Sequence, residues 1–270
     1  MADLTLCKGY NSSRDAASET STRPALWKCC RMRMLGSDRK KFSGRYSGEA
    51  AEQYEDDRRD AKWDREEQLF DEFYARVAPQ SVLDCPIGTG RFLDRYVRDD
   101  ILALGVDLSD DMLAQAALKI PAGANIQLRK ADVLNATRIS ELGSEHDLIV
   151  CVRFVYAVAR NDLPTLFRNF AATRSRYLLV GVRVRPDATG WGQRFLRLFW
   201  VDHSKRPRLP FGRRSKRYVA TEEALHRLFH DTGWKIVERG ALTKEANLGR
   251  YFYLLRLSSI DKEAAAPQGR

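Results

Sequence analysis

Two acidic residues and two glycines are the side chains of this sequence best placed to bind a charged ligand. Asp84 ends a short apolar run, and Gly88 and Gly90 follow it within six residues. Glycine lets the backbone approach a ligand closely, and the N–H groups at the start of a helix face that ligand. Asp107 ends the next apolar run, where nucleotide-binding α/β folds use an acid to bind ribose hydroxyls. These residues predict a nucleotide-type site, and a purely structural turn is the alternative.

A dinucleotide cofactor is a second interpretation of the same loop. The dinucleotide fingerprint is Gly-x-Gly-x-x-Gly, whereas the glycines of residues 88–90 are followed by Arg91, Phe92 and Leu93. The third glycine is absent, although alanine-tolerant variants of the fingerprint exist. The antiparallel strands expected at the end of the chain are also unlike the usual dinucleotide fold.

The elements that must position these residues alternate along the chain. Continuous apolar runs predict strands, and apolar spacing of i, i+3, i+4 predicts helices. Strands are expected over residues 81–84, 102–106, 125–129, 148–152 and 177–182. Helices are expected over 48–78, 91–97, 110–120 and 163–173, and a last helix is expected between Thr221 and Gly233.

This alternation predicts an α/β fold, with a doubly wound, mostly parallel seven-stranded sheet and helices on both of its faces. The last two strands are expected over 234–239 and 251–257. The turn-rich residues between them are too few for a helical crossover, so these strands should form a C-terminal antiparallel hairpin.

Composition limits the class of protein and its surroundings. The chain has 270 residues and a formal net charge of +10, an excess that attracts anionic partners. It has no transmembrane segment and no signal-peptide pattern, so a cytoplasmic protein is expected. Its five cysteines contain no Cys-x-x-Cys pair, so we expect reduced thiols and no metal site.

Taken in order, the motifs resemble those of class I S-adenosylmethionine (SAM)-dependent methyltransferases. Residues 83–91 resemble the first motif and 106–113 the second, while 130–133 and 147–154 resemble the adenine segment and the fourth strand. The resemblance implies SAM as cofactor and a methyltransferase domain over residues 46–258. Residues 1–45 are expected to be a mostly disordered basic tail, and 259–270 a second disordered tail. The sequence departs from the family at Pro86, where glycine is commonest, because proline has no N–H to donate.

The resemblance also implies roles for the cofactor-binding residues. Asp84 should orient the methionyl ammonium, Asp107 should accept the ribose hydroxyls, and Asp132 should bond the adenine amine. Val133 would donate its backbone N–H to the adenine ring. Met112 would pack on that ring, although an apolar helix position is more often simply core. The expected cofactor contacts are Tyr54, Arg58, Asp84, Pro86, Gly88, Gly90, Asp107, Leu108, Met112, Asp132 and Val133.

Two further groups of residues are expected at the ends of the cofactor. Tyr54 and Arg58 share a face of the leading helix, which often covers the cofactor in this family. Arg58 or Arg59 would bind the SAM carboxylate, and a solvated charged face is the alternative. Just past the fourth strand, Arg153 and Tyr156 are placed to contact the acceptor and are the expected catalytic residues.

Residues 190–217 form a basic, aromatic insertion before the last helix. Arginines among aromatic side chains suit phosphate contact and base stacking, and equally suit a phosphorylated metabolite, a membrane surface or plain solvation. The expected function is methyl transfer to a small or anionic acceptor. An RNA (nucleic-acid) methyltransferase is one alternative, and a non-catalytic SAM-fold binding module is another.

Overall fold

The computed structural model of this chain describes residues 48–54, 61–135, 142–143, 145–185, 220–245 and 248–259. The N-terminal tail, Arg58, Arg59, the basic insertion at 190–217 and residues 260–270 lie outside the described residues.

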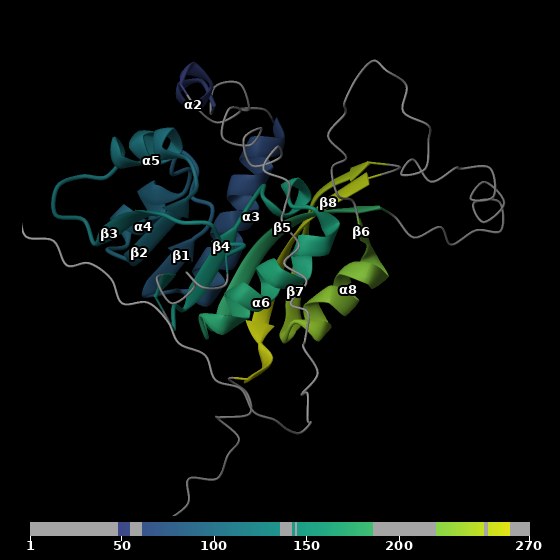
Figure 1. Cartoon of the computed structure of the whole chain (residues 1–270). Coiled ribbons are helices and arrows are strands. Elements are labelled where there is room, and N and C mark those ends of the chain that lie inside the picture. The colour runs from purple at the N-terminus through teal and green to yellow at the C-terminus, as the bar shows by residue number, and fades with distance from the viewer. Residues whose placement is uncertain are drawn as a thin grey trace, which may run out of the picture.

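One sheet runs through the middle of the molecule, in the order β3-β2-β1-β4-β5-β8-β7 (Figure 1). The neighbours from β3 to β5 are parallel, and β8 is antiparallel to both β5 and β7. The strand bounds are β1 Ser81–Asp84, β2 Leu102–Asp107, β3 Ile126–Lys130, β4 Leu148–Cys151, β5 Tyr177–Arg185, β7 Trp234–Glu245 and β8 Leu248–Leu257. The expected fold class is therefore confirmed. A short eighth strand, β6 (Ala220–Thr221), pairs with β5 and was not predicted, because two residues carry no periodicity.

Helices cover both faces of the sheet and enclose two apolar cores (Figure 1). On one face lie α3 (Ala61–Val77), α4 (Leu93–Arg98) and α5 (Asp110–Ala117). On the other lie α6 (Leu163–Ala172) and α8 (Glu222–Asp231), while two 3₁₀ turns, η3 (Val155–Ala157) and η4 (Arg160–Asp162), follow β4. Among the described residues, no helix is both long and apolar enough to cross a bilayer.

Side-chain caps begin α5 and α8. Ser109 accepts a hydrogen bond from the backbone N–H of Met112, and Thr221 accepts one from Ala224. Each cap satisfies an N–H group that has no partner inside its helix. The cap on α5 matters for the site, because this helix starts directly after the strand that carries Asp107.

The prediction of one helix over residues 48–78 was wrong. A short helix, α2 (Glu49–Glu52), ends in a turn at Gln53 and Tyr54, and α3 begins only at Ala61. Gln53 caps α2 at its C-terminal end, so the helix stops there, and residues 55–60 lie outside the described residues. The apolar face predicted for α3 is present: Phe70, Phe73 and Tyr74 are buried in the core beneath it.

Candidate functional site

The predicted cofactor residues meet at the carboxyl ends of β1 and β2. These strands are parallel neighbours, with Asp84 opposite Gly105, so their last residues lie at the same edge of the sheet. β4 lies on the other side of β1 and ends at Cys151. Ligands of open α/β sheets bind outside the carboxyl ends of the strands, so this edge is the place to look for the site.

Asp107 connects β2 to the loop that follows β1. Its Oδ2 accepts a hydrogen bond from the N–H of Gly88 at 3.0 Å, and its Oδ1 accepts one from Ser109 at 2.9 Å. Burial raises the pKa of the Asp107 carboxyl above its ordinary value, and these backbone hydrogen bonds oppose the rise. The carboxylate remains partly exposed, so it can accept further hydrogen bonds.

The two glycines of the loop have different surroundings. Both have a left-handed backbone, with φ of 58° at Gly88 and 75° at Gly90. A Cβ at Gly90 would lie 2.2 Å from Cδ1 of the buried Leu93, so this glycine serves close packing against α4. A Cβ at Gly88 would meet no atom within 4 Å, so the backbone there borders open space beside Asp107.

Asp84 lies deeper than Asp107 and is only 3% exposed. The Tyr96 hydroxyl of α4 donates a hydrogen bond to its Oδ2 at 3.1 Å. Burial raises the pKa of the Asp84 carboxyl to about 8, although the bond from Tyr96 opposes this rise. Asp84 is therefore mostly protonated at neutral pH, and a nearby cation would favour its ionised form.

The predicted adenine contacts lie beside Asp107. Leu108 is 43% exposed, whereas Met112 is 2% exposed, so Leu108 offers the accessible apolar surface and Met112 lies in the core. Asp132 accepts a hydrogen bond from the N–H of Leu134. The carbonyl of Val133 is bonded by Asn169, and its N–H donates to none of the described residues. The open space at Gly88, the exposed Leu108 and this N–H together fit an adenosine-type ligand.

The remaining predicted cofactor contacts are less defined. Tyr54 is half-buried in the turn after α2, a helix that packs on α5 through a bond from the N–H of Gly48 to Asp111 (3.0 Å). Pro86 is half-buried in the loop after β1 and has no N–H to offer. Arg58 lies outside the described residues.

Arg153, one of the two predicted catalytic residues, is bonded to the helix that covers its side of the sheet. Its Nε donates to Oε2 of Glu66 at 2.6 Å, and its guanidinium lies 4.7 Å from the centre of the Trp63 ring. Its backbone is left-handed, with φ of 59°, which is unfavourable for any residue but glycine. The side chain is 17% exposed, and its two terminal nitrogens bond none of the described residues.

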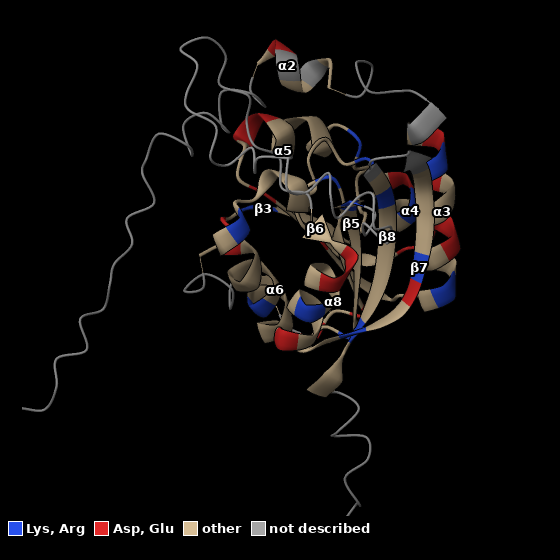
Figure 2. Ribbon diagram, turned by 90° about the vertical axis from the view of Figure 1, so that its right-hand side faces the viewer, with Lys and Arg blue, Asp and Glu red and all other residues tan. Residues whose placement is uncertain are grey.

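Arg91, the residue after the Gly loop, shares the same glutamate. Its Nη1 donates to Oε2 of Glu66 at 2.7 Å, its Nη2 donates to the carbonyl of Trp63, and its Nε lies 3.3 Å from Glu67. Its guanidinium stacks on the Trp63 ring at 3.6 Å. Figure 2 shows both signs of charge along α3, but Glu66 is one of its buried members. Glu66 therefore joins α3 to the loops that follow β1 and β4.

Tyr156, the second predicted catalytic residue, lies in η3 just past Arg153. The guanidinium of Arg183, near the end of β5, lies 4.1 Å from the centre of its ring. This is a stacking distance for a cation on an aromatic face. The Tyr156 ring is partly exposed and borders the same edge of the sheet as Arg153.

The thiols of Cys85 and Cys151 lie under the site but are fully buried. Burial raises the pKa of both thiols above the ordinary range of cysteine. A buried neutral thiol is a poor nucleophile, so neither residue is suited to covalent catalysis.

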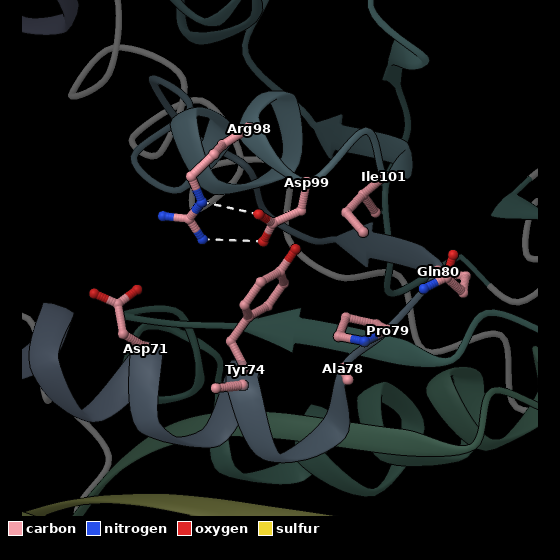
Figure 3. Close-up of a pocket in the computed structure, with 9 residues that line it drawn as sticks. Asp71, Tyr74, Ala78, Pro79, Gln80, Arg98, Asp99 and Ile101 are labelled. Carbon is pink, nitrogen blue, oxygen red and sulfur yellow. Dashed lines mark hydrogen bonds and ion pairs between the residues drawn. The ribbon is translucent and has the colours of Figure 1, made fainter.

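A cavity of about 470 Å³ lies at the opposite edge of the sheet (Figure 3). It is bordered by Pro79 and Gln80, which precede β1, and by Ile101, which precedes β2. The Tyr74 side chain points toward Asp99 there, and burial raises the pKa of its hydroxyl. The cavity is thus separated from the candidate site by the length of the strands.

Sequence reasoning missed several side chains of the site. Tyr96 lies in the helix expected over 91–97 but was not predicted to contact Asp84, and Glu66, Trp63 and Arg183 were not singled out. Glu66 and Arg153 are 87 positions apart, so no local pattern could join them. Arg91 belongs to the first motif, and its place directly after the glycines was the one available signal.

Comparisons with known proteins agree with this site. Residues 82–174 match the model of a family described as "Methyltransferase domain". They include β1, β2, β4 and the loops between them, so the resemblance to class I SAM-dependent methyltransferases is confirmed there. A 94-residue segment is 33% identical to dTDP-4-amino-2,3,4,6-tetradeoxy-D-glucose N,N-dimethyltransferase of Saccharopolyspora spinosa. It covers 34% of this chain and 35% of that protein, so the match spans about a third of each.

Solved structures share the fold at low sequence identity. Magnesium protoporphyrin IX methyltransferase from Synechocystis PCC 6803, with bound SAH, has a TM-score of 0.57 and 15% identity over 81% of this chain and 99% of that one. The [4+2]-cyclase SpnF has a TM-score of 0.51 and 14% identity over 70% of this chain and 81% of that one. At such identities the likeness extends to the fold alone.

Proposed function

We propose that this chain, whose residues 82–174 match the model of a methyltransferase-domain family, is a SAM-dependent methyltransferase acting on a small or anionic acceptor. The observation that carries the proposal is the bond between Asp107 and the N–H of Gly88. It places a ribose-type acid and an open glycine loop side by side at the carboxyl edge of the sheet. A structural β–α turn would not require either the open space or the exposed Leu108.

In this proposal each end of SAM has its own residues. Asp84 faces the methionyl ammonium, Gly88 and Gly90 pass beneath the cofactor, and Asp107 accepts the ribose hydroxyls. Leu108 covers one side of the adenine, which Asp132 and the N–H of Val133 bind at its edge. Tyr54 belongs to the leading segment that would cover the cofactor. Pro86 shapes the loop after β1 without donating a hydrogen bond. Met112 supports this surface from the core.

The chain itself has little chemistry to perform. SAM supplies a methyl group on a sulfonium, which is already a good leaving group. The protein must align acceptor and methyl group and exclude water. Arg153 and Tyr156 are the residues we propose to contact the acceptor, because they follow β4 next to Asp84 and border the same edge. A base is needed only where the acceptor atom must lose a proton.

A small acceptor is supported by the curated relative, whose name describes methylation of the amino group of a dTDP-linked sugar. The RNA alternative depends on residues 190–217, which lie outside the described residues. The fold also occurs in a protein named as a [4+2]-cyclase, so it is not confined to proteins named for methyl transfer. Fold alone therefore does not decide between methyl transfer and another use of the site.

Transfer of radiolabelled methyl groups tests the proposal. The full-length chain is incubated with methyl-labelled SAM and a cell extract that has been separated into small-molecule, RNA and protein fractions. We expect label in the small-molecule fraction, and strongly reduced label when Asp107→Ala replaces the wild type. Label in RNA would support the first alternative. Absence of label in every fraction, with SAM still bound, would support a non-catalytic module.

A further inference from the structure

Three arginines gather at the carboxyl edge of β4 and β5, beside the proposed site. Arg153 lies two residues past the end of β4, and Arg183 lies near the end of β5. Arg250 of β8 is the direct cross-strand partner of Arg183. The backbone nitrogen of Arg153 would be 3.6 Å from a Cβ at Gly181, two residues before Arg183. The three residues therefore come from three neighbouring segments of the sheet.

These arginines also belong to one face of the sheet. Side chains two residues apart on a strand point to the same side, so Arg183 shares a side with Gly181, and Arg250 with Phe252. Phe252 contacts Gly181 and is buried in the core beneath α3. Arg153 is bonded to Glu66 of α3. All three therefore lie on the face that α3 covers.

Two of these arginines, Arg153 and Arg250, keep donor groups that no described residue bonds. Like charges directly opposite each other on antiparallel strands destabilise a sheet, and Arg183 and Arg250 are such a pair. Arg250 makes no ion pair with any described residue, and its Nε is buried without a hydrogen bond. Arg153 uses only Nε, on a glutamate that it shares with Arg91. Glu66 thus holds the Arg153 guanidinium at Nε, and its two terminal nitrogens are available to a ligand.

We propose that Arg153, Arg183 and Arg250 form a subsite for a phosphate or diphosphate group of the acceptor. This inference rests on the proposed function and names the substrate class for it. In the sheet order β2-β1-β4-β5-β8, the subsite lies over β4, β5 and β8, while Asp107 ends β2. An acceptor anchored there would extend toward β1 and β4, where the methyl group would lie.

The chemistry of the subsite favours phosphate. A guanidinium presents parallel N–H groups that bind two oxygens of one oxyanion, and several arginines suit an anion with more than one charge. The Tyr156 ring lies against Arg183 and limits the positions its guanidinium can take. An anion at this place would also offset the repulsion between Arg183 and Arg250.

Calorimetric titration of the full-length chain with inorganic pyrophosphate tests the subsite, both without SAH and with SAH added. We expect binding that Arg153→Met and Arg250→Met each weaken at least tenfold, because a charge-assisted hydrogen bond is lost. The control is Arg168→Met, an exposed arginine of α6 on the opposite face, which should bind like the wild type. Two target variants are used so that a folding defect in one, detected by circular dichroism, does not decide the outcome.

Three results would overturn the subsite. They are no pyrophosphate binding by the wild type, unchanged binding in both target variants, or an equal loss in the Arg168→Met control. A ten-nucleotide single-stranded RNA that binds through Arg153 and Arg250, while pyrophosphate does not, would also overturn the small phosphorylated acceptor. SAH binding is measured in the same samples. Failure to bind SAH contradicts the proposed function, whereas failure to bind only the anion contradicts this inference.

We propose that Glu66 positions the Arg153 side chain. The direction in which Glu66→Gln changes pyrophosphate affinity distinguishes this role from an effect of net charge. Glu66→Gln raises the net charge by one, so general electrostatic attraction predicts tighter binding of pyrophosphate. If Glu66 instead holds Arg153 in place, the same variant weakens pyrophosphate binding at least threefold while SAH binding is kept. Tighter or equal binding would contradict the positioning role.

Discussion

The carboxylate of Asp107 accepts a hydrogen bond from the backbone N–H of Gly88 at 3.0 Å, so the end of β2 holds the loop that leaves β1. The same carboxylate also accepts the N–H of Ser109. One side chain therefore fixes the start of α5 and the glycine loop together. In the proposed function its remaining lone pairs bind the ribose.

Substitution of Asp107 should accordingly weaken the cofactor site. Asp107→Ala is expected to reduce affinity for SAH at least tenfold, since hydrogen bonds to a charged group contribute about 1.5–3 kcal/mol. Calorimetric titration measures the change, with the exposed Asp231→Ala of α8 as the matched control. Equal affinity in Asp107→Ala and the wild type would remove Asp107 from the site.

The two loop glycines should respond differently to alanine. Gly90→Ala places a methyl group against buried Leu93 at a left-handed position, so we expect a loss of unfolding free energy of about 2–4 kcal/mol. Gly88→Ala meets open space, so its loss should be only about 1–2 kcal/mol from the backbone. SAH affinity should nevertheless fall in Gly88→Ala. Urea denaturation and calorimetry measure the two effects, and the reverse ranking in stability would contradict the packing described here.

The raised pKa of Asp84 predicts a pH dependence of cofactor binding. In the protein without cofactor, the Asp84 carboxyl has a pKa of about 8, and the methionyl ammonium would favour its ionised form. Affinity for SAH should therefore rise with pH between 6 and 8, by up to about tenfold per unit. The rise ends above about pH 8, where the Asp84 carboxyl is already ionised in the cofactor-free protein. Asp84→Asn should bind more weakly with a flat profile, and a rising profile in that variant would exclude Asp84 as the cause.

The same group should affect the stability of the cofactor-free protein. Its folded pKa of about 8 lies above the unfolded value of 3.8, so the folded state binds more protons between these values. The stabilising contribution is complete below pH 4 and is lost as pH rises toward 8. Thermal unfolding of Asp84→Asn should lack this loss. A wild-type melting temperature with the same pH profile as the variant would contradict the assignment.

Glu66 is predicted to be the costliest of the charged residues on α3 to remove. Its side chain is 6% exposed and bonds both Arg91 and Arg153, so Glu66→Ala leaves two largely buried cations without their shared carboxylate. Breaking a buried ion pair costs about 3–5 kcal/mol. The exposed pair of Glu223 and Arg227 is the control, where Glu223→Ala should cost under about 1 kcal/mol. Denaturant unfolding of both variants measures the difference, and similar costs would show that Glu66 is not structurally important.

The sequence was sufficient to predict the elements whose signals are local. A buried run that ends at Asp84 and a glycine loop that opens a helix depend on neighbouring residues, so the strand, the loop and the antiparallel C-terminal hairpin could be predicted. The prediction of one leading helix was wrong because α2 ends at Glu52 in a turn, which the apolar spacing of residues 70–77 could not indicate.

Long-range contacts were beyond that reasoning. The hydrogen bond from Tyr96 to Asp84 needs α4 to fold back over β1, and the bond from Arg153 to Glu66 joins segments 87 residues apart. The pairing of Arg183 with Arg250 depends on the antiparallel register of β5 and β8. Each partner has an ordinary local sequence, so only the assembled sheet brings them together.

Titration of the full-length chain with SAH, and separately with NAD, tests the central claim most directly. The account predicts that each chain binds one SAH and that Asp107→Ala lowers this affinity at least tenfold. No comparable binding of NAD is expected, because the third glycine of the dinucleotide fingerprint is absent from this sequence. Tight binding of NAD without binding of SAH would contradict the account, because the acid and glycine loop would then serve a different cofactor.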